Sequence, residues 1–317
     1  MYILKHIPDD FIVTEVSTII PKLEGKFIYF TLKKTDFTIH EALRRLAKEL
    51  NLPLKNFSYA GIKDRRAITE QVCGVSGVTK EQLSRVNIKD IQIEFLGYGS
   101  DPVHVGDLEG NQFKIIIRKI EKLPIINAKF RNLFGEQRFS TQNVGIGRFL
   151  LQRKFKEAAE LIAVKDVHLS KIMHVDASTK DFVGSLRRIP RKQLLFFIHA
   201  FQSHLWNNAA MKTKEGELPL VGFGTVVEDK STKQALAQEN IKPRDFIIKE
   251  LPEISAEGGI RNVWAQASNL SVGKFEPDEC FEGKKKVKIE FFLPRGCYAT
   301  EFIKQAMNVP QQLLQSL

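Results

Sequence analysis

The chain has 317 residues, and its 48 lysines and arginines outnumber 37 aspartates and glutamates, for a formal net charge of +11. An excess of positive charge on this scale argues against an acidic solvating protein and suits a polyanionic partner such as nucleic acid. Hydrophobic residues make up 43% of the chain, which is enough for a sizeable core, and the length predicts two domains.

Cysteine usage and hydropathy exclude further classes of protein. The three cysteines, Cys73, Cys280 and Cys297, are far apart and form no Cys-x-x-Cys pair. This pattern argues against a disulfide scaffold or zinc site and indicates a reducing compartment, so we expect buried, inert thiols. No segment approaches the run of about 20 apolar residues that a membrane span needs. The first residues, MYILKHIPDDF, lack the apolar core of a signal peptide, so a soluble cytoplasmic protein is expected.

Periodicity predicts strands in the first third of the chain and near its end, with helices between. We expect strands at residues 12–16, 27–33, 57–60, 91–98, 110–118 and 287–293. Thr38 and Glu41 form a capping box that opens an amphipathic helix at residues 38–50, and Thr79 with Gln82 begins a short second helix. Apolar spacing predicts further helices at residues 153–162, 190–211 and 301–307, whereas residues 218–260 show no clear pattern.

One carboxylate stands among cations in the stretch FSYAGIKDRRAITEQ at residues 57–71. Lys63 precedes Asp64, and Arg65 and Arg66 follow it. Nearby positive charge favours the ionised carboxylate, and the same cations could hold phosphates. Two interpretations follow: an exposed cluster that neutralises itself, or a nucleophile or base within a nucleic-acid-binding surface.

Other motifs carry little chemistry. Gly145-Ile146-Gly147 lacks the third glycine and the preceding strand of a dinucleotide loop. His199 and His204 are five residues apart, which does not fit the i, i+4 metal pair, so we interpret them as structural or surface residues. The lysines at 284–286 fit an exposed, solvated run. No Gly-x-Ser-x-Gly elbow of a hydrolase is present.

The central stretch also matches a known pattern, Gly-x-Lys-Asp-x-x-Ala-x-Thr-x-Gln, with Gly61, Lys63, Asp64, Ala67, Thr69 and Gln71. This pattern resembles the signature of the TruD family of pseudouridine synthases. In that family the aspartate of the motif is catalytic. The resemblance therefore implies that Asp64 is the catalytic residue.

Two further motifs resemble the same family and imply substrate-binding residues. The start, Lys-x-x-Pro-x-Asp-Phe, matches Lys5 and Phe11, and the lysine there is a basic residue of the family's active site. An ammonium near a catalytic aspartate would keep it ionised. The pattern Gly-Asn-x-Phe implies that Asn111 and Phe113 line the uridine pocket, with Phe113 stacking on the base. From periodicity alone, Phe113 is a core residue on the buried face of a strand with Ile115.

Three later segments extend the resemblance with small departures. Residues 131–139 resemble the Asn-Tyr-Phe-Gly-x-Gln-Arg-Phe-Gly motif, with Leu133 in place of the aromatic residue and Ser140 in place of the last glycine. Residues 199–203 resemble a His-Ala-Phe-Gln-Ser helix, to which we assign a scaffold role. Residues 291–300 resemble the closing motif, with Cys297 where serine is common.

The resemblance implies an α/β (α+β) fold. A pseudouridine-synthase-type catalytic domain with a mixed or antiparallel sheet and flanking helices would comprise residues 1–130 and 268–317. A mostly helical TruD-specific insertion domain would occupy residues 131–267.

The implied activity is isomerisation of uridine to pseudouridine, typically uridine 13 of tRNA, by an isomerase that needs no metal or cofactor. We expect a tRNA substrate, no membrane, no obligatory protein partner and a monomer. The alternative is a non-catalytic RNA-binding protein on the same scaffold, which would keep the cations and lose nothing if Asp64 changed. A weaker third option, a hydrolase, would release uracil or cleaved RNA.

Overall fold

The computed structural model of the chain describes residues 2–136, 139–174 and 179–307. The described chain divides into two compact units, which are taken one at a time. The first comprises residues 2–129, 266–299 and 305–307, and the second comprises Phe130–Ala265 and Thr300–Lys304. Two divisions fall within β7 (Lys129–Arg131) and β10 (Trp264–Gln266), which pair as a two-stranded sheet, and the other two fall within α9 (Ala299–Met307). The predicted assignment of catalytic and insertion domains, divided at 130/131 and 267/268, stays a prediction.

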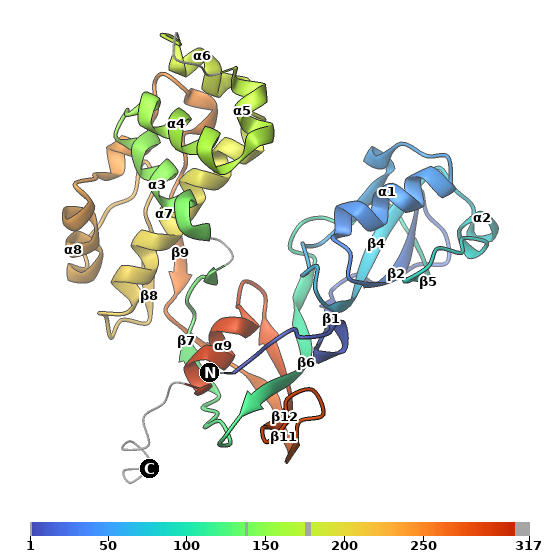
Figure 1. The fold of residues 1–317 in the computed structure, drawn as a ribbon. Helices are drawn as coiled ribbons and strands as arrows, with labels where there is room; N and C mark the ends of the chain where they lie inside the picture. The colour runs from blue at the N-terminus through green and yellow to red at the C-terminus, as the bar shows by residue number, and fades with distance from the viewer. Residues whose placement is uncertain (1, 137–138, 175–178, 308–317) are drawn as a thin grey trace. The chain divides into compact units, whose positions relative to one another are not determined.

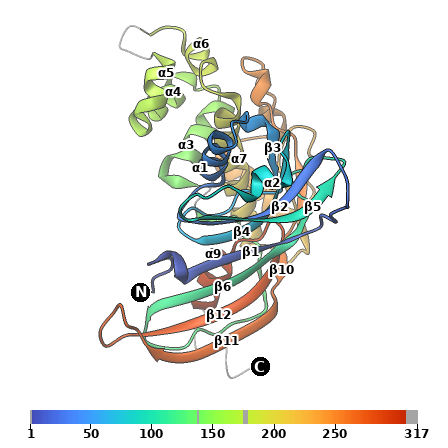
Figure 2. The same cartoon turned by 90° about the vertical axis from the view of Figure 1, so that its right-hand side faces the viewer.

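An eight-stranded mixed sheet forms the first unit, in the order β11-β12-β6-β1-β4-β2-β5, with β3 paired to β4 (Figure 2). Strand β1 runs parallel to β4, and its other neighbour, β6, is antiparallel to it. The sheet therefore joins segments from both ends of the chain. Its strands are β1 (Phe11–Ser17), β2 (Phe27–Thr35), β3 (Phe57–Tyr59), β4 (Ile68–Ser76), β5 (Ile91–Gly99), β6 (Leu108–Ile120), β11 (Ser268–Pro277) and β12 (Lys285–Pro294).

Helix α1 (Ile39–Glu49) begins at the predicted capping box. The backbone N–H of Glu41 donates to Thr38 Oγ1 at 3.2 Å, and the backbone N–H of Thr38 donates to Glu41 Oε2 at 2.8 Å. Two donors that the first helical turn leaves unpaired are thus satisfied, which fixes where the helix starts. The same arrangement, with Thr79 and Gln82, opens α2 (Lys80–Ser84).

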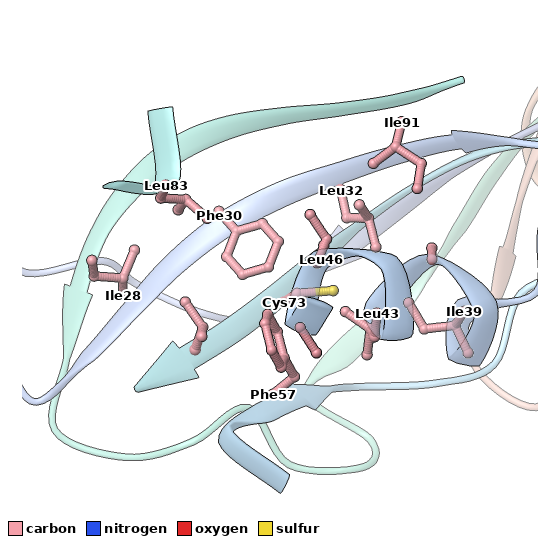
Figure 3. Packing of buried hydrophobic residues seen from close by; sticks show 13 residues of the cluster. Ile28, Phe30, Leu32, Ile39, Leu43, Leu46, Phe57, Cys73, Leu83 and Ile91 are labelled. Carbon is pink, nitrogen blue, oxygen red and sulfur yellow. The ribbon is translucent and has the colours of Figure 1, made fainter. Parts of the chain in front are cut away.

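The apolar face of α1 packs on the sheet and forms the core of this region (Figures 1 and 3). Leu43 and Leu46 of α1 meet Phe30 and Leu32 of β2 and Cys73 of β4, all of them buried. Apolar residues at i, i+3 and i+4 form the buried face of the helix, and alternate residues of the strands form the face of the sheet that packs against it. The helix and the strand at residues 27–33 were both predicted from these two periodicities.

The second unit is mostly helical, with α7 (Arg191–Ala210) as its longest helix. Gly147 of α3 lies so close to α7 that a Cβ there would be 2.2 Å from the carbonyl oxygen of Phe197. The Gly-x-Gly segment is thus a helix-packing position and not a phosphate loop. The other helices and strands are α3 (Ser140–Leu151), α4 (Phe155–Lys165), α5 (Val167–Met173), α6 (Phe182–Arg187), α8 (Lys230–Glu239), β8 (Glu217–Leu220) and β9 (Gly259–Asn262). The final helix is α9 (Ala299–Met307).

The cysteines correct one expectation. Cys73 is buried, and burial raises the pKa of its thiol, whereas Cys297 is half-buried and Cys280 is exposed. Cys280 lies in the turn between β11 and β12, where its backbone N–H donates to Asp278 Oδ1 at 3.0 Å. A turn at the end of a sheet leaves the side chain in solvent, so the expectation of three buried thiols is wrong for this residue.

The lysine run at 284–286 is also less free than expected. Lys284 contacts Glu121 at 2.5 Å, and Lys286 contacts Glu279 at 2.6 Å with its side chain only 18% exposed. The hydrogen bond to Glu279 raises the pKa of Lys286. Lys284 in the turn before β12 and Lys286 near the start of β12 are therefore engaged locally. No helix in the described chain is long and apolar enough to cross a membrane.

We expect Leu46→Ala to destabilise the first unit by about 2–5 kcal/mol, because it opens a cavity in the core beneath α1. Leu46 is 0% exposed. Urea unfolding followed by circular dichroism would measure the change. The matched control is Arg44→Ala on the exposed face of the same helix, which should change stability by less than about 0.5 kcal/mol. Equal losses in both variants would contradict the packing described here.

Candidate active site

The central motif forms the loop at residues 60–67 between β3 and β4. Asp64 lies in this loop with its side chain 27% exposed. Lys5 Nζ is 2.9 Å from Asp64 Oδ1, and the side chain of Lys5 is 14% exposed. The structure thus brings together the two residues for which the resemblance implied an electrostatic partnership, although they lie 59 positions apart in the chain (64 − 5).

Backbone pairing holds Lys5 in place. Ile3 exchanges two backbone hydrogen bonds with Arg118 of β6, each 3.0 Å long. Lys5 follows with φ 57°, a left-handed conformation that turns the chain before β1. Its Nζ also lies 4.1 Å from the ring centroid of Phe11, within the range of a cation–π contact.

Arg118 is the buried hub of this N-terminal region, with 1% of the residue exposed. Its guanidinium contacts Asp10 at 2.8 Å and Asp278 at 2.9 Å. The hydrogen bonds that the guanidinium donates to the Asp10 carboxylate raise the pKa of Arg118, so Arg118 stays charged. The segment before β1 and the turn after β11 are thereby attached to β6.

Lys63, the residue before Asp64, has a different partner. Its ammonium forms a buried ion pair with Glu15 of β1, and both residues are only 8% exposed. Glu15 Oε1 also accepts a hydrogen bond of 3.2 Å from the backbone N–H of Val72. Arg65 and Arg66 are exposed. Of the three cations adjacent in sequence, one therefore anchors the loop and two face solvent.

The loop has further attachments to the sheet and to the start of α1. Gln71 Nε2 donates to the carbonyl oxygen of Gly61 at 3.0 Å, and Lys34 Nζ donates to that of Asp64 at 3.1 Å. The backbone N–H of Asp36 donates to the carbonyl oxygen of Ala67 at 3.2 Å. Contacts near the beginning, middle and end of the loop thus define its conformation.

Two rows of side chains share one face of the sheet, because directly paired residues point to the same side. One row is Lys34, Thr69, Val13, Phe113 and Phe291. The neighbouring row contains Glu15, Asn111 and Leu293. Gly110 permits the close approach of β12, since a Cβ there would lie 2.1 Å from the carbonyl oxygen of Leu293. The sheet register therefore places both predicted pocket residues beside Glu15.

Phe113 and Phe11 belong to an aromatic cluster. The ring of Phe113 stacks on Phe291 with centroids 5.4 Å apart and planes 24° apart, and it meets the edge of Phe11 at 6.1 Å. Phe113 is 6% exposed and Phe11 is 1% exposed. The interpretation of Phe113 as a core residue thus agrees with its burial, and its role toward a base stays a prediction.

Three buried polar atoms on this face have no hydrogen-bond partner: Thr69 Oγ1, Gln71 Oε1 and Asn111 Oδ1. Buried polar groups are satisfied in the great majority of cases, so such a group is a candidate for a ligand or an ordered water. Asn111 is half-buried in β6, whereas Thr69 and Gln71 are buried.

Sequence reasoning missed the functions of Lys34 and Glu15. Both are charged residues at core-facing positions of strands, which is the signal that could have identified them. Burial lowers the pKa of Lys34 to about 8, and the charge of Lys63 adds to this effect while that of Asp64 opposes it. Within the described ranges no group of three or more histidines, cysteines, aspartates or glutamates could hold a metal ion.

The remaining motif residues serve the scaffold or lie outside the described chain. Gln202 of the His-Ala-Phe-Gln-Ser helix donates to the carbonyl oxygens of Val221 at 2.8 Å and Glu257 at 3.1 Å. His204 contacts Glu239 at 3.2 Å, in agreement with a structural role. Gln137 and Arg138 of the 131–139 motif lie outside the described residues.

Comparison with solved structures defines the class of fold. A crystal structure of a TruD protein from Methanosarcina mazei superimposes with a TM-score of 0.73 at 24% sequence identity, covering 96% of this chain and 93% of that one. The mixed sheet with flanking helices is therefore a pseudouridine-synthase-type fold, and the predicted fold class is confirmed.

Comparison with known sequences gives the family. The family model described as tRNA pseudouridine synthase D (TruD) matches residues 2–170 and 216–306. The tRNA pseudouridine synthase D of Aquifex aeolicus is 25% identical over 95% of this chain and 97% of its own length. A relative from Thermococcus onnurineus named for the same enzyme is 28% identical over 96% of this chain and 94% of its own. The chain belongs to the TruD family of tRNA pseudouridine synthases, which are isomerases.

We expect Lys63→Met to destabilise the protein by about 3–5 kcal/mol, because it leaves the Glu15 carboxylate buried without its cation. Thermal unfolding would measure the loss, with the exposed Lys89→Met as matched control. Glu15→Ala should cost a similar amount, and the double variant should cost less than the sum of the two singles. Additive losses would show that the two residues do not interact.

Proposed function

We propose that the chain converts a uridine of tRNA into pseudouridine. In this reaction the N1–C1′ glycosidic bond breaks, the uracil turns, and C5 forms a new bond to C1′. A proton leaves C5 and N1 carries one at the end, so the composition and mass of the RNA do not change. The reaction is an isomerisation without net oxidation or reduction, so it balances without a redox cofactor.

Asp64 is the residue proposed to perform the chemistry. The observation that carries this assignment is its contact of 2.9 Å with Lys5 in a loop attached to the sheet by buried groups. The carboxylate would either attack the sugar or remove a proton from it, and both routes need an ionised group held in a defined position.

Asn111, Phe113 and Phe11 are the proposed uridine-binding residues. A base inside a folded RNA must leave its stack before C1′ can be reached, which costs a few kcal/mol. An aromatic ring stacked on the base contributes about 1–3 kcal/mol toward this cost. The unpaired, buried Oδ1 of Asn111 supports a hydrogen bond to the edge of the uracil.

The first unit is the proposed catalytic domain, because it contains all five of these residues, and the helical second unit is the proposed insertion domain. The resemblance supports uridine 13 as the target. A net charge of +11 and the exposed Arg65 and Arg66 beside Asp64 support a polyanionic substrate.

Asp64→Asn should lower the rate of pseudouridine formation on the order of 10⁴-fold, because the neutral amide can neither attack nor accept a proton. Carbodiimide-dependent reverse-transcription stops on a tRNA transcript would map the product. Asp36→Asn is the matched control, since Asp36 is exposed and its φ of 58° suits asparagine. A gel shift at fixed salt should give the same affinity for both variants and the wild type. Equal tRNA binding without modification by the wild type would favour a non-catalytic RNA-binding protein.

Arg65→Ala should weaken tRNA binding and reduce the slope of log affinity against log salt concentration by about 1, because one phosphate contact is lost. Binding titrations at several salt concentrations would measure the slope. A slope identical to that of the wild type would contradict a phosphate contact at this position.

A further inference from the structure

Lys34 lies near the end of β2 on the face of the sheet that also carries Phe113. It is 1% exposed. Its Nζ donates to the carbonyl oxygen of Phe37 at 2.5 Å and to that of Asp64 at 3.1 Å. The ammonium therefore joins the turn before α1 to the loop at the residue proposed to be catalytic.

A buried ammonium held by two neutral carbonyl oxygens is a costly arrangement, because burial of a charge is repaid fully only by a close counter-charge. The charged or titratable groups that face Lys34 are Asp64 and Lys63 of the loop, Glu41 of α1 and the Cys73 thiol of β4. Desolvation outweighs the attraction of the carboxylates, and the pKa of Lys34 falls to about 8. Costs of this kind concentrate at functional sites.

We propose that Lys34 is a positioning residue that fixes the backbone of Asp64 for the reaction with uridine. This proposal rests on the proposed function. Lys34 need not touch the reacting atoms, because it acts through the carbonyl group of Asp64 while Lys5 contacts the carboxylate of the same residue. A displacement of about 1 Å in a reacting group can cost about 100-fold in rate, so a single hydrogen bond at this position has a large effect.

The first test compares Lys34→Met with Lys33→Met. Methionine has nearly the length of lysine but carries no charge, and the neighbouring Lys33 is exposed on the opposite face of β2. We expect Lys34→Met to lower the single-turnover rate of pseudouridine formation by about 10- to 100-fold, while the dissociation constant for tRNA stays within about threefold of the wild type. Lys33→Met should keep the wild-type rate.

Stability separates positioning from a merely structural role. Removal of a buried ammonium that has carbonyl partners but no contacting counter-charge should leave the unfolding midpoint of Lys34→Met unchanged or higher. Between about pH 8 and the ordinary lysine pKa of 10.5, the unfolded wild type binds a proton that the folded protein has lost. The unfolding free energy of the wild type should therefore rise with pH relative to that of Lys34→Met across this window.

Hydrogen exchange supplies a readout that is independent of activity. Amides at residues 61–67 should exchange faster in Lys34→Met than in the wild type, and Lys33→Met should leave them unchanged. An unchanged loop, or a single-turnover rate within about twofold of the wild type, would overturn the proposal. So would a loss of rate that merely follows a loss of folded protein. If the wild type has no activity on tRNA, the proposed function is contradicted. Hydrogen exchange at residues 61–67 would still show whether Lys34 fixes the loop.

Discussion

The carboxylate of Glu15 is buried in the middle of the sheet, so the first unit must supply a cation to neutralise it. It points into the core from β1, between β4 and β6, where water cannot solvate it. Lys63 satisfies it, and to do so the loop after β3 must fold back over the sheet. Because Lys63 and Asp64 are adjacent, turning the first inward leaves the second at the surface of the loop, 27% exposed. The buried ion pair of Glu15 and Lys63 thus determines where Asp64, the proposed catalytic residue, lies.

Arg118 imposes a second constraint of the same kind. Its guanidinium, buried in β6, holds Asp10 before β1 and Asp278 after β11. The backbone of the same residue pairs with Ile3, so the N-terminal segment enters along β6 and presents Lys5 to Asp64. The buried charges of Glu15 in β1 and Arg118 in β6 therefore both help to form the contact between Lys5 and Asp64. The buried charges of this unit position the loop and the N-terminal segment more than they stabilise the fold. Lys34 is another buried charge of this kind, since it holds the backbone of Asp64.

Local rules predicted much of the fold, because capping boxes and periodic apolar residues act over short distances. The box of Thr38 marks the start of α1 correctly. Strand β11 was missed because nearly all of its residues are exposed and show no alternation; only its pairing with β12 makes it a strand. The partner of Lys63 lies 48 residues away, and a single sequence does not reveal which distant carboxylate neutralises a buried cation. The roles of Asn111 and Phe113 followed from the resemblance alone, since their spacing equally fits a core strand.

The pairing of β12 with β6 also bears on how the chain folds during synthesis. Residues 285–294 complete the row that contains Phe113, yet they leave the ribosome long after residues 110–120. Until then β6 has an open edge and Phe113 lacks the ring of Phe291 on which it stacks. Pairings between distant segments form slowly and leave unpaired strand edges prone to aggregation. Nascent chains that end before β12 should therefore depend on chaperones at this edge, even though the core around α1 needs only residues 28–98.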